Sequence, residues 1–193
     1  MPDPETIRAF LALDPPPEAL RRIADIQTVL RGNIQGAFSW VRPEGIHLTL
    51  KFFGAIAAAG VGAISEVITG QTAGARPLNL EAKGLGVFPD TRRPRVLWLG
   101  ISGEVERLIA LQQAIDRGLE AFGFAREQRP FRAHLTLARI KSPQGLEGLN
   151  SVLAGKKSES AGKFMATGLT LFKSELTPKG AIYTELDHFP FQG

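Results

Sequence analysis

The chain has 193 residues, of which 44% are hydrophobic, and its net charge is +4. This mild positive charge fits an anionic substrate such as a phosphate ester or an RNA end, although many proteins of similar charge bind neither. The absence of cysteine excludes disulfides, a thiolate nucleophile and a cysteine-based zinc site. No stretch approaches about eighteen apolar residues, and Asp3 and Glu5 precede the first apolar run, so we expect no membrane span, no signal peptide and a cytoplasmic protein.

The first half of the chain alternates strand and helix patterns. Ile7–Leu13 is a mostly apolar run that ends before three prolines, which is typical of a buried strand. Apolar residues then recur at helical spacing from Pro16 and Pro17 to a stop at Gly32. Further along we expect a short extended segment at 40–41, a strand at 46–53, a helix at 55–69 and a strand at 78–87.

The second half repeats this alternation. The sequence predicts a helix over Glu104–Phe122, because its apolar residues fall on one side. The remaining expected elements are strands at 95–101, 132–140, 163–172 and 181–189, a short helix at 145–154 and a turn at 178–180. The basic segment at 92–95 has turn composition, and either a solvated turn or a contact with an RNA backbone would explain it. Lys156 and Lys157 are expected only to lie on the surface.

One motif occurs twice, at Arg42–Leu50 and Arg129–Leu137, with His-Leu-Thr-Leu in both copies 87 residues apart. Alternation along a strand places His47 and Thr49 on one face and the leucines on the other, and it does the same for His134 and Thr136. Duplication of an α+β unit is the economical interpretation. We therefore expect residues 1–193 to form one bilobal domain: two pseudo-symmetric lobes, each a mainly antiparallel sheet with helices outside, around a central cleft.

Two imidazoles facing one cleft suit acid/base chemistry, because one can activate a nucleophile while the other protonates a leaving oxygen. A threonine two residues after each histidine lies about 6.6 Å further along the strand, within reach of the oxygens of the same small anion. A phosphate fits this spacing, and a ribose 2′,3′-cyclic phosphate is an attractive substrate because its ring already holds the reacting atoms together. Such an enzyme needs no metal or other cofactor, and no carboxylate–histidine cluster has ligand spacing.

These residues also resemble a known family. The paired motif, Arg8–Leu13, Trp40–Glu44, Pro94–Gly100 and His134–Arg139 are similar to the RNA 2′,3′-cyclic phosphodiesterases, or 2′-5′ RNA ligases, of the two-histidine phosphoesterase superfamily. The resemblance runs from Arg8 to Tyr183, with Ala133 standing where relatives often have proline. It implies two α+β lobes with their histidine strands facing each other, and metal-independent opening of RNA-terminal cyclic phosphates to 2′-phosphates. We expect a monomer that binds no membrane.

The resemblance also implies a role for each site residue. His47 would be the general acid at O3′ and His134 the base that activates water. Thr49 and Thr136 would bind phosphate oxygens, Arg139 would clamp the phosphate, and Phe52 would stack on the terminal base. Strict alternation instead places Lys51 and Ala138 on the histidine face, so Phe52 and Arg139 reach the site only if each strand ends, twists or bulges there.

Three alternatives stay open at this point. The enzyme could ligate RNA through a 2′-5′ bond, or it could cleave a related cyclic or 2′-5′-linked nucleotide. The chain could also be a non-catalytic module that binds nucleotides, although binding alone does not need two proton-transfer groups. His188, the third histidine, is not followed by the Leu-Thr of the motif, and we expect no catalytic role for it.

Overall fold

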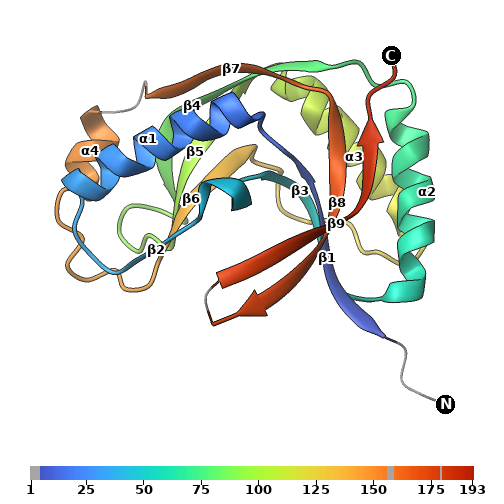
Figure 1. Cartoon of the computed structure of the whole chain (residues 1–193), viewed down its shortest axis with the longest axis horizontal. Coiled ribbons are helices and arrows are strands. Elements are labelled where there is room, and N and C mark those ends of the chain that lie inside the picture. Colours follow the sequence, from blue (N-terminus) through green and yellow to red (C-terminus); the bar gives the residue numbers. More distant parts are fainter. Residues whose placement is uncertain (1–4, 156–158, 179) are drawn as a thin grey trace.

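The computed structural model describes residues 5–155, 159–178 and 180–193, which form two sheets flanked by helices (Figure 1). The strands are β1 (Thr6–Leu13), β2 (Phe38–Trp40), β3 (Leu48–Ala57), β4 (Leu78–Phe88), β5 (Val96–Gly103), β6 (His134–Ile140), β7 (Ser160–Ala166), β8 (Gly168–Thr177) and β9 (Gly180–Pro190). The helices are α1 (Pro17–Asn33), α2 (Val61–Thr72), α3 (Val105–Glu120) and α4 (Leu149–Gly155), with 3-10 turns η1 (Pro43–Gly45) and η2 (Ala58–Gly60). In these ranges no helix combines the length and the apolar character needed to cross a bilayer.

Both sheets are built from antiparallel strand pairs. Sheet A has the strand order β3-β1-β8-β9, and sheet B has the order β2-β6-β5-β4-β7. β1 and β3 in sheet A correspond to β5 and β6 in sheet B, as expected for a duplicated unit. The predicted α+β class with two antiparallel sheets is confirmed.

The two lobes do not coincide with the two halves of the sequence. β8 of the second half pairs with β1, and β4 of the first half pairs with β5. α1 of the first half packs against β7 of sheet B, whereas α3 of the second half packs beside α2 and contacts both β3 of sheet A and β4 of sheet B (Figure 1). The short connection from β4 to β5 favours pairing of these neighbouring strands, and that pairing draws β4 into sheet B.

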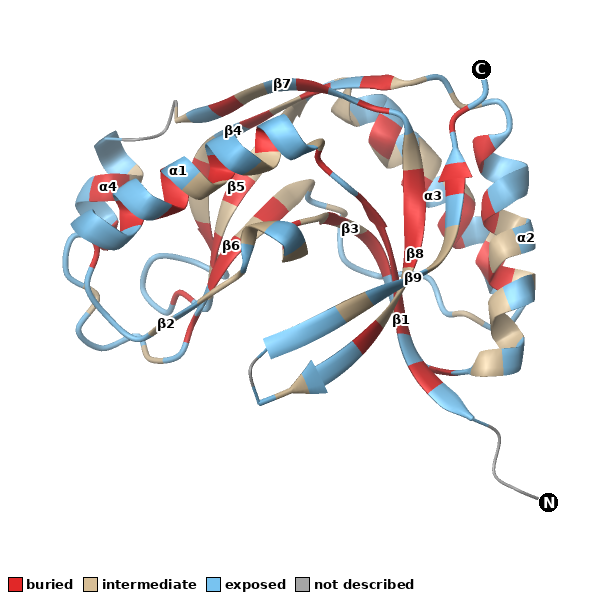
Figure 2. Ribbon diagram, in the orientation of Figure 1, coloured by how far each residue is buried: buried red, intermediate tan, exposed pale blue. Residues whose placement is uncertain are grey.

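Buried residues, shown in red in Figure 2, are concentrated in the strands of both sheets and along one side of the long helices. In α1 the buried set includes Ile23, Ile26 and Leu30, and in α3 it includes Leu108, Ile115 and Leu119. These residues recur at helical spacing, which is why the amphipathic pattern located both helices correctly.

Two predicted elements differ from the structure. Residues 55–57 extend β3 instead of starting a helix, because they pair with β1 and this pairing overrides the helix propensity of alanine. The single strand expected at 163–172 is divided into β7 and β8, which belong to different sheets. Two expectations fall on residues outside the described ranges: the surface position of Lys156 and Lys157, and the part of the predicted turn at Lys179.

Candidate active site

His47 lies between η1 and β3, and aromatic rings of sheet A enclose its imidazole. The ring stacks on Phe10 with centroids 4.6 Å apart and meets Tyr183 edge-on at 5.1 Å. Burial lowers the pKa of His47 from 6.5 to about 4, and a backbone hydrogen bond to Gly45 opposes this effect only in part. The imidazole of the unliganded protein is therefore neutral at pH 7.

His134 is the first residue of β6 and occupies the equivalent place in the second copy. Its Nδ1 lies 2.6 Å from the carbonyl oxygen of Arg132. A carbonyl can only accept, so Nδ1 carries a proton, and when this is the only proton on the ring, Nε2 has a lone pair that can accept another. Phe88 packs edge-on against the ring at 4.9 Å. Each histidine is thus tied to the backbone two residues before it, through Gly45 in one copy and Arg132 in the other.

A β-bulge in the first copy turns Phe52 to the face that carries Thr49. Thr49 pairs with Ala12 and Lys51 pairs with Leu11, which leaves Leu50 as the extra residue. Beyond the bulge, Phe52 pairs with Phe10, two residues from Ala12, and so shares the face of Thr49. Its ring lies parallel to that of Phe10 at 6.2 Å and is 55% exposed, so it is accessible from solvent.

An equivalent bulge in the second copy does the same for Arg139. Thr136 pairs with Trp98 and Ala138 with Leu97, so the extra residue is Leu137, the repeat partner of Leu50. Arg139 then pairs with Val96 and shares the face of His134 and Thr136, where its side chain is exposed.

The placement that strict alternation gave to Lys51 and Ala138 was therefore wrong. Both point to the core side of their sheets, where Ala138 is fully buried and Lys51 forms a buried ion pair with Asp116 of α3. A single extra residue in one strand reverses the face to which the following side chains point. This happens at matching positions in the two copies.

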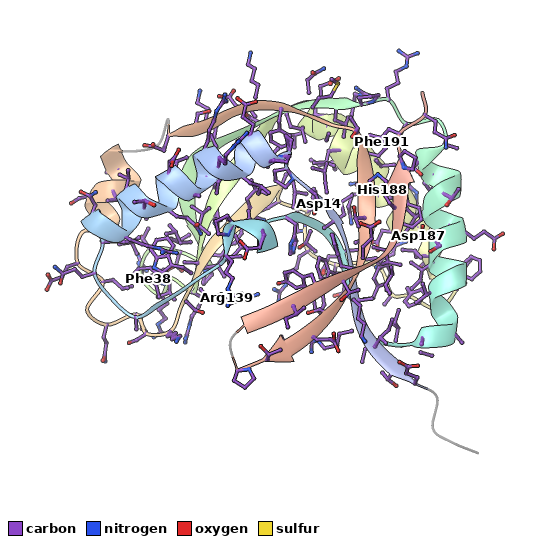
Figure 3. The ribbon with its side chains drawn as sticks, in the orientation of Figure 1. Asp14, Phe38, Arg139, Asp187, His188 and Phe191 are labelled. Atoms are coloured by element: carbon purple, nitrogen blue, oxygen red, sulfur yellow. The ribbon has the colours of Figure 1, made fainter. Side chains whose placement is uncertain are left out.

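Tyr183 of β9 links the two copies. Its ring contacts His47 in sheet A, and the Arg139 guanidinium of sheet B lies close enough to lower the pKa of its hydroxyl, although burial has the larger effect and raises that pKa. Figure 3 shows Arg139 on the side of sheet B next to the β8–β9 hairpin. His47 of sheet A and Arg139 of sheet B therefore border one region beside Tyr183, where an imidazole and a guanidinium can contact a small anion.

Comparison with known proteins identifies the family. The profile of the LigT-like phosphoesterases matches residues 13–98 and, a second time, residues 99–183. The chain belongs to the LigT-like phosphoesterase family. The double match also confirms the internal duplication.

Several relatives of this LigT-like phosphoesterase are named RNA 2′,3′-cyclic phosphodiesterase. One from Methanothermobacter thermautotrophicus is 33% identical over 95% of this chain and 98% of its own length. Another from Archaeoglobus fulgidus is 32% identical over 95% of this chain and 99% of its own. A crystal structure from Thermus thermophilus has a TM-score of 0.78 at 28% identity, covering 97% of this chain and 99% of that one. Escherichia coli LigT complexed with 3′-AMP has the same fold, with a TM-score of 0.76 at 23% identity over 98% of this chain and all of that one.

The aromatic surroundings of the histidines in the LigT-like phosphoesterase were not assigned to the site from the sequence. Phe10, Phe172 and Tyr183 surround His47, and Phe88 and Trp98 lie beside His134. Phe10, Trp98, Phe172 and Tyr183 lie within predicted strands and Phe88 directly follows one, and Phe10 and Trp98 also belong to the stretches that carry the family resemblance. None of this predicted their contacts with the histidines, because those contacts depend on which strands pair. The basic turn is confirmed as exposed: the backbone N–H groups of Arg92 and Arg93 donate to Asp90.

His188 lies in a separate polar cluster with Asp14 and Thr170, away from Arg139 (Figure 3). Its Nδ1 is 3.1 Å from the Thr170 hydroxyl, which also hydrogen-bonds to Asp14. Burial raises the pKa of Asp14, and the Thr170 hydrogen bond partly opposes that effect. Nowhere among residues 5–155, 159–178 and 180–193 do three metal-ligating side chains come together.

Proposed function

We propose that this chain hydrolyses RNA-terminal 2′,3′-cyclic phosphates to 2′-phosphates by acid/base catalysis with two histidines and without a metal. The observation that carries the proposal is the matched geometry of the two copies. Each copy brings a histidine, a threonine and a bulge-turned residue to one face of its sheet. The names of relatives that cover nearly the full chain support the same substrate class. Because each sheet contains strands from both halves, we also propose that residues 1–193 work as one bilobal unit.

The proposed reaction begins with water. Nε2 of His134 accepts a proton from water as its oxygen bonds to phosphorus, and the bond from phosphorus to O3′ breaks. His47 in its protonated form donates a proton to O3′, which leaves a 3′-hydroxyl and a 2′-phosphate. The hydroxyls of Thr49 and Thr136 and the guanidinium of Arg139 bind the non-bridging oxygens while charge on them increases. Solvent exchange then restores both histidines.

The pKa of His47 sets a requirement for this assignment. With a pKa of about 4, only a very small fraction of the free protein carries the proton that the general acid must donate. An anionic phosphate beside the ring favours the charged imidazolium and raises its pKa. We therefore assign the gain of this proton to the substrate-bound state.

The decisive experiment measures turnover of an oligonucleotide that ends in a 2′,3′-cyclic phosphate, with EDTA present. We expect full activity in EDTA, a 2′-phosphate product, and a loss of several orders of magnitude in both His47→Ala and His134→Ala. Substrates with a 5′-hydroxyl RNA acceptor, a small cyclic nucleotide or a 2′-5′ linkage, assayed in parallel, distinguish hydrolysis from the related reactions. A requirement for a divalent metal would overturn the proposal, and so would binding of 2′-AMP with no turnover of any substrate.

A further inference from the structure

Two buried glutamines contact the bulges that turn Phe52 and Arg139 toward the site. Gln27 of α1 is 2% exposed and Gln112 of α3 is 5% exposed, so both amides are enclosed by protein. Glutamine is seldom this buried, and a buried amide requires partners. The reaction proposed above uses neither side chain, so their burial calls for a separate explanation.

Gln27 donates to the second bulge. Its Nε2 lies 3.0 Å from the carbonyl oxygen of Leu137, the extra residue, and 2.9 Å from that of Val41. The N–H of Val41 also donates to the carbonyl oxygen of Leu137 at 3.0 Å. One amide therefore joins the chain segment that follows β2 to the bulge, at a point two residues before Arg139.

Gln112 does the same for the first bulge. Its Nε2 lies 3.4 Å from the carbonyl oxygen of Leu50, the extra residue there. One helical turn later, Asp116 binds Lys51, whose Nζ also donates to the carbonyl of Ala125 at 2.9 Å. α3 thus contacts two consecutive residues of the bulge, and both contacts lie just before Phe52.

The two contacts are equivalent and crossed between the halves of the chain. Gln27 comes from the first half and binds the bulge of the second copy, whereas Gln112 comes from the second half and binds the bulge of the first. The bound carbonyls belong to Leu50 and Leu137, which occupy the same position of the repeat. Such symmetry indicates one shared purpose for the two amides.

We propose that Gln27 and Gln112 are positioning residues that fix the bulges: Gln27 sets the direction of Arg139 toward the phosphate, and Gln112 sets the direction of Phe52 toward the base. This inference rests on the function proposed above. Without the amide donor, the extra residue of the bulge loses the hydrogen bond that fixes it, so the strand can slip by one residue. Such a slip turns the side chains that follow to the opposite face of the sheet.

The test measures binding of inorganic phosphate and of 2′-AMP by NMR titration, so that it does not depend on turnover. Gln27→Met removes the donor at similar volume and should weaken both ligands about tenfold, as expected for a misdirected charge-assisted contact. Gln112→Met should leave phosphate affinity unchanged and weaken 2′-AMP by about tenfold, because a stacking contact with the base is lost.

Ile23→Val and Ile115→Val serve as matched controls, because they alter buried core positions of the same two helices without touching a bulge carbonyl. Both should bind the two ligands as the unsubstituted chain does. Gln27→Met added to Arg139→Ala should weaken phosphate binding no further, because the two changes act on one contact. If Gln27→Met does not fold, Gln27→Leu, which also lacks the donor, replaces it in every arm.

The outcomes separate this inference from the proposed function. Unchanged phosphate affinity in the Gln27 variant, or an effect that adds to that of Arg139→Ala, overturns the positioning role. A loss that Ile23→Val reproduces also overturns it, because general destabilisation would then explain the result. If Arg139→Ala itself binds phosphate normally, Arg139 is not the phosphate ligand and the proposed site is wrong.

Discussion

The protonation of His47 offers the sharpest test of the proposed reaction. In the free protein the pKa of His47 is about 4, roughly three units below pH 7, so about one molecule in a thousand carries the protonated imidazole. Half-protonation at pH 7 requires the bound ligand to favour imidazolium by about 4 kcal/mol. One phosphate charge about 4 Å away supplies close to 4 kcal/mol at an effective dielectric constant of about 20. The substrate can therefore restore the proton that burial removes.

NMR titration of the imidazole protons measures this effect, and the chain has only three histidines to assign. We expect the pKa of His47 to be about 4 without ligand and to approach neutrality when inorganic phosphate or 2′-AMP is saturating. His188 lies in a separate cluster with Thr170, and its imidazole signals serve as the internal control. A His47 pKa that stays below about 5 in the complex would refute the general-acid assignment, because the ring would still be neutral at working pH.

Three further predictions concern the framework of the site. Folding lowers the pKa of His47, so the unfolded chain binds more protons than the folded chain between pH 6.5 and about 4. The free energy of unfolding should therefore fall by up to about 3 kcal/mol as the pH drops through this window. Urea unfolding of His47→Gln should lack this part of the loss. Lys51→Met should cost about 3–5 kcal/mol by leaving Asp116 buried and unpaired, whereas the double change Lys51→Met with Asp116→Leu should recover most of it; equal losses in both variants would contradict this account. Gly86→Ala places a methyl group 2.2 Å from the Trp98 ring, so the indole must move, and thermal unfolding and turnover should both decline.

The sequence was sufficient to predict most of the strands, the amphipathic helices and the duplicated motif, but not the division of the segment at 163–172 into two strands. Alternation alone gave the wrong face for Phe52 and Arg139, and the family resemblance placed them at the site only on the condition that each strand ends, twists or bulges there. Which of these occurs could not be predicted, because the register depends on partners far away in the chain. Leu50 is contacted by Gln112, and Leu137 by Gln27 at a separation of 110 residues. Alternation is a local rule, and such long-range contacts override it.

The exchange of strands between the sheets was unpredictable for a related reason. Two equivalent halves can pack as separate lobes or can exchange matching strands, and both arrangements bury the same apolar faces. The choice depends on the short connection between Phe88 and Val96, which favours pairing of β4 with β5 across the midpoint of the chain. Aromatic contacts such as Phe10 with His47 then follow from strand order.

The duplication also explains how a symmetric scaffold can serve an asymmetric substrate. The two copies keep the same histidine, threonine and bulge, which suits a reaction that adds a proton on one side of phosphorus and removes one on the other. They differ at the residue that the bulge turns outward, since Phe52 offers an aromatic surface and Arg139 a bidentate cation. A terminal nucleotide has one base and one phosphate. If the same residue type stood at both positions, either the base or the phosphate would lack a suitable partner. Under the proposed function, the matching bulges therefore place Arg139 at the reacting phosphate and Phe52 at the base, and this difference between the copies orients the substrate.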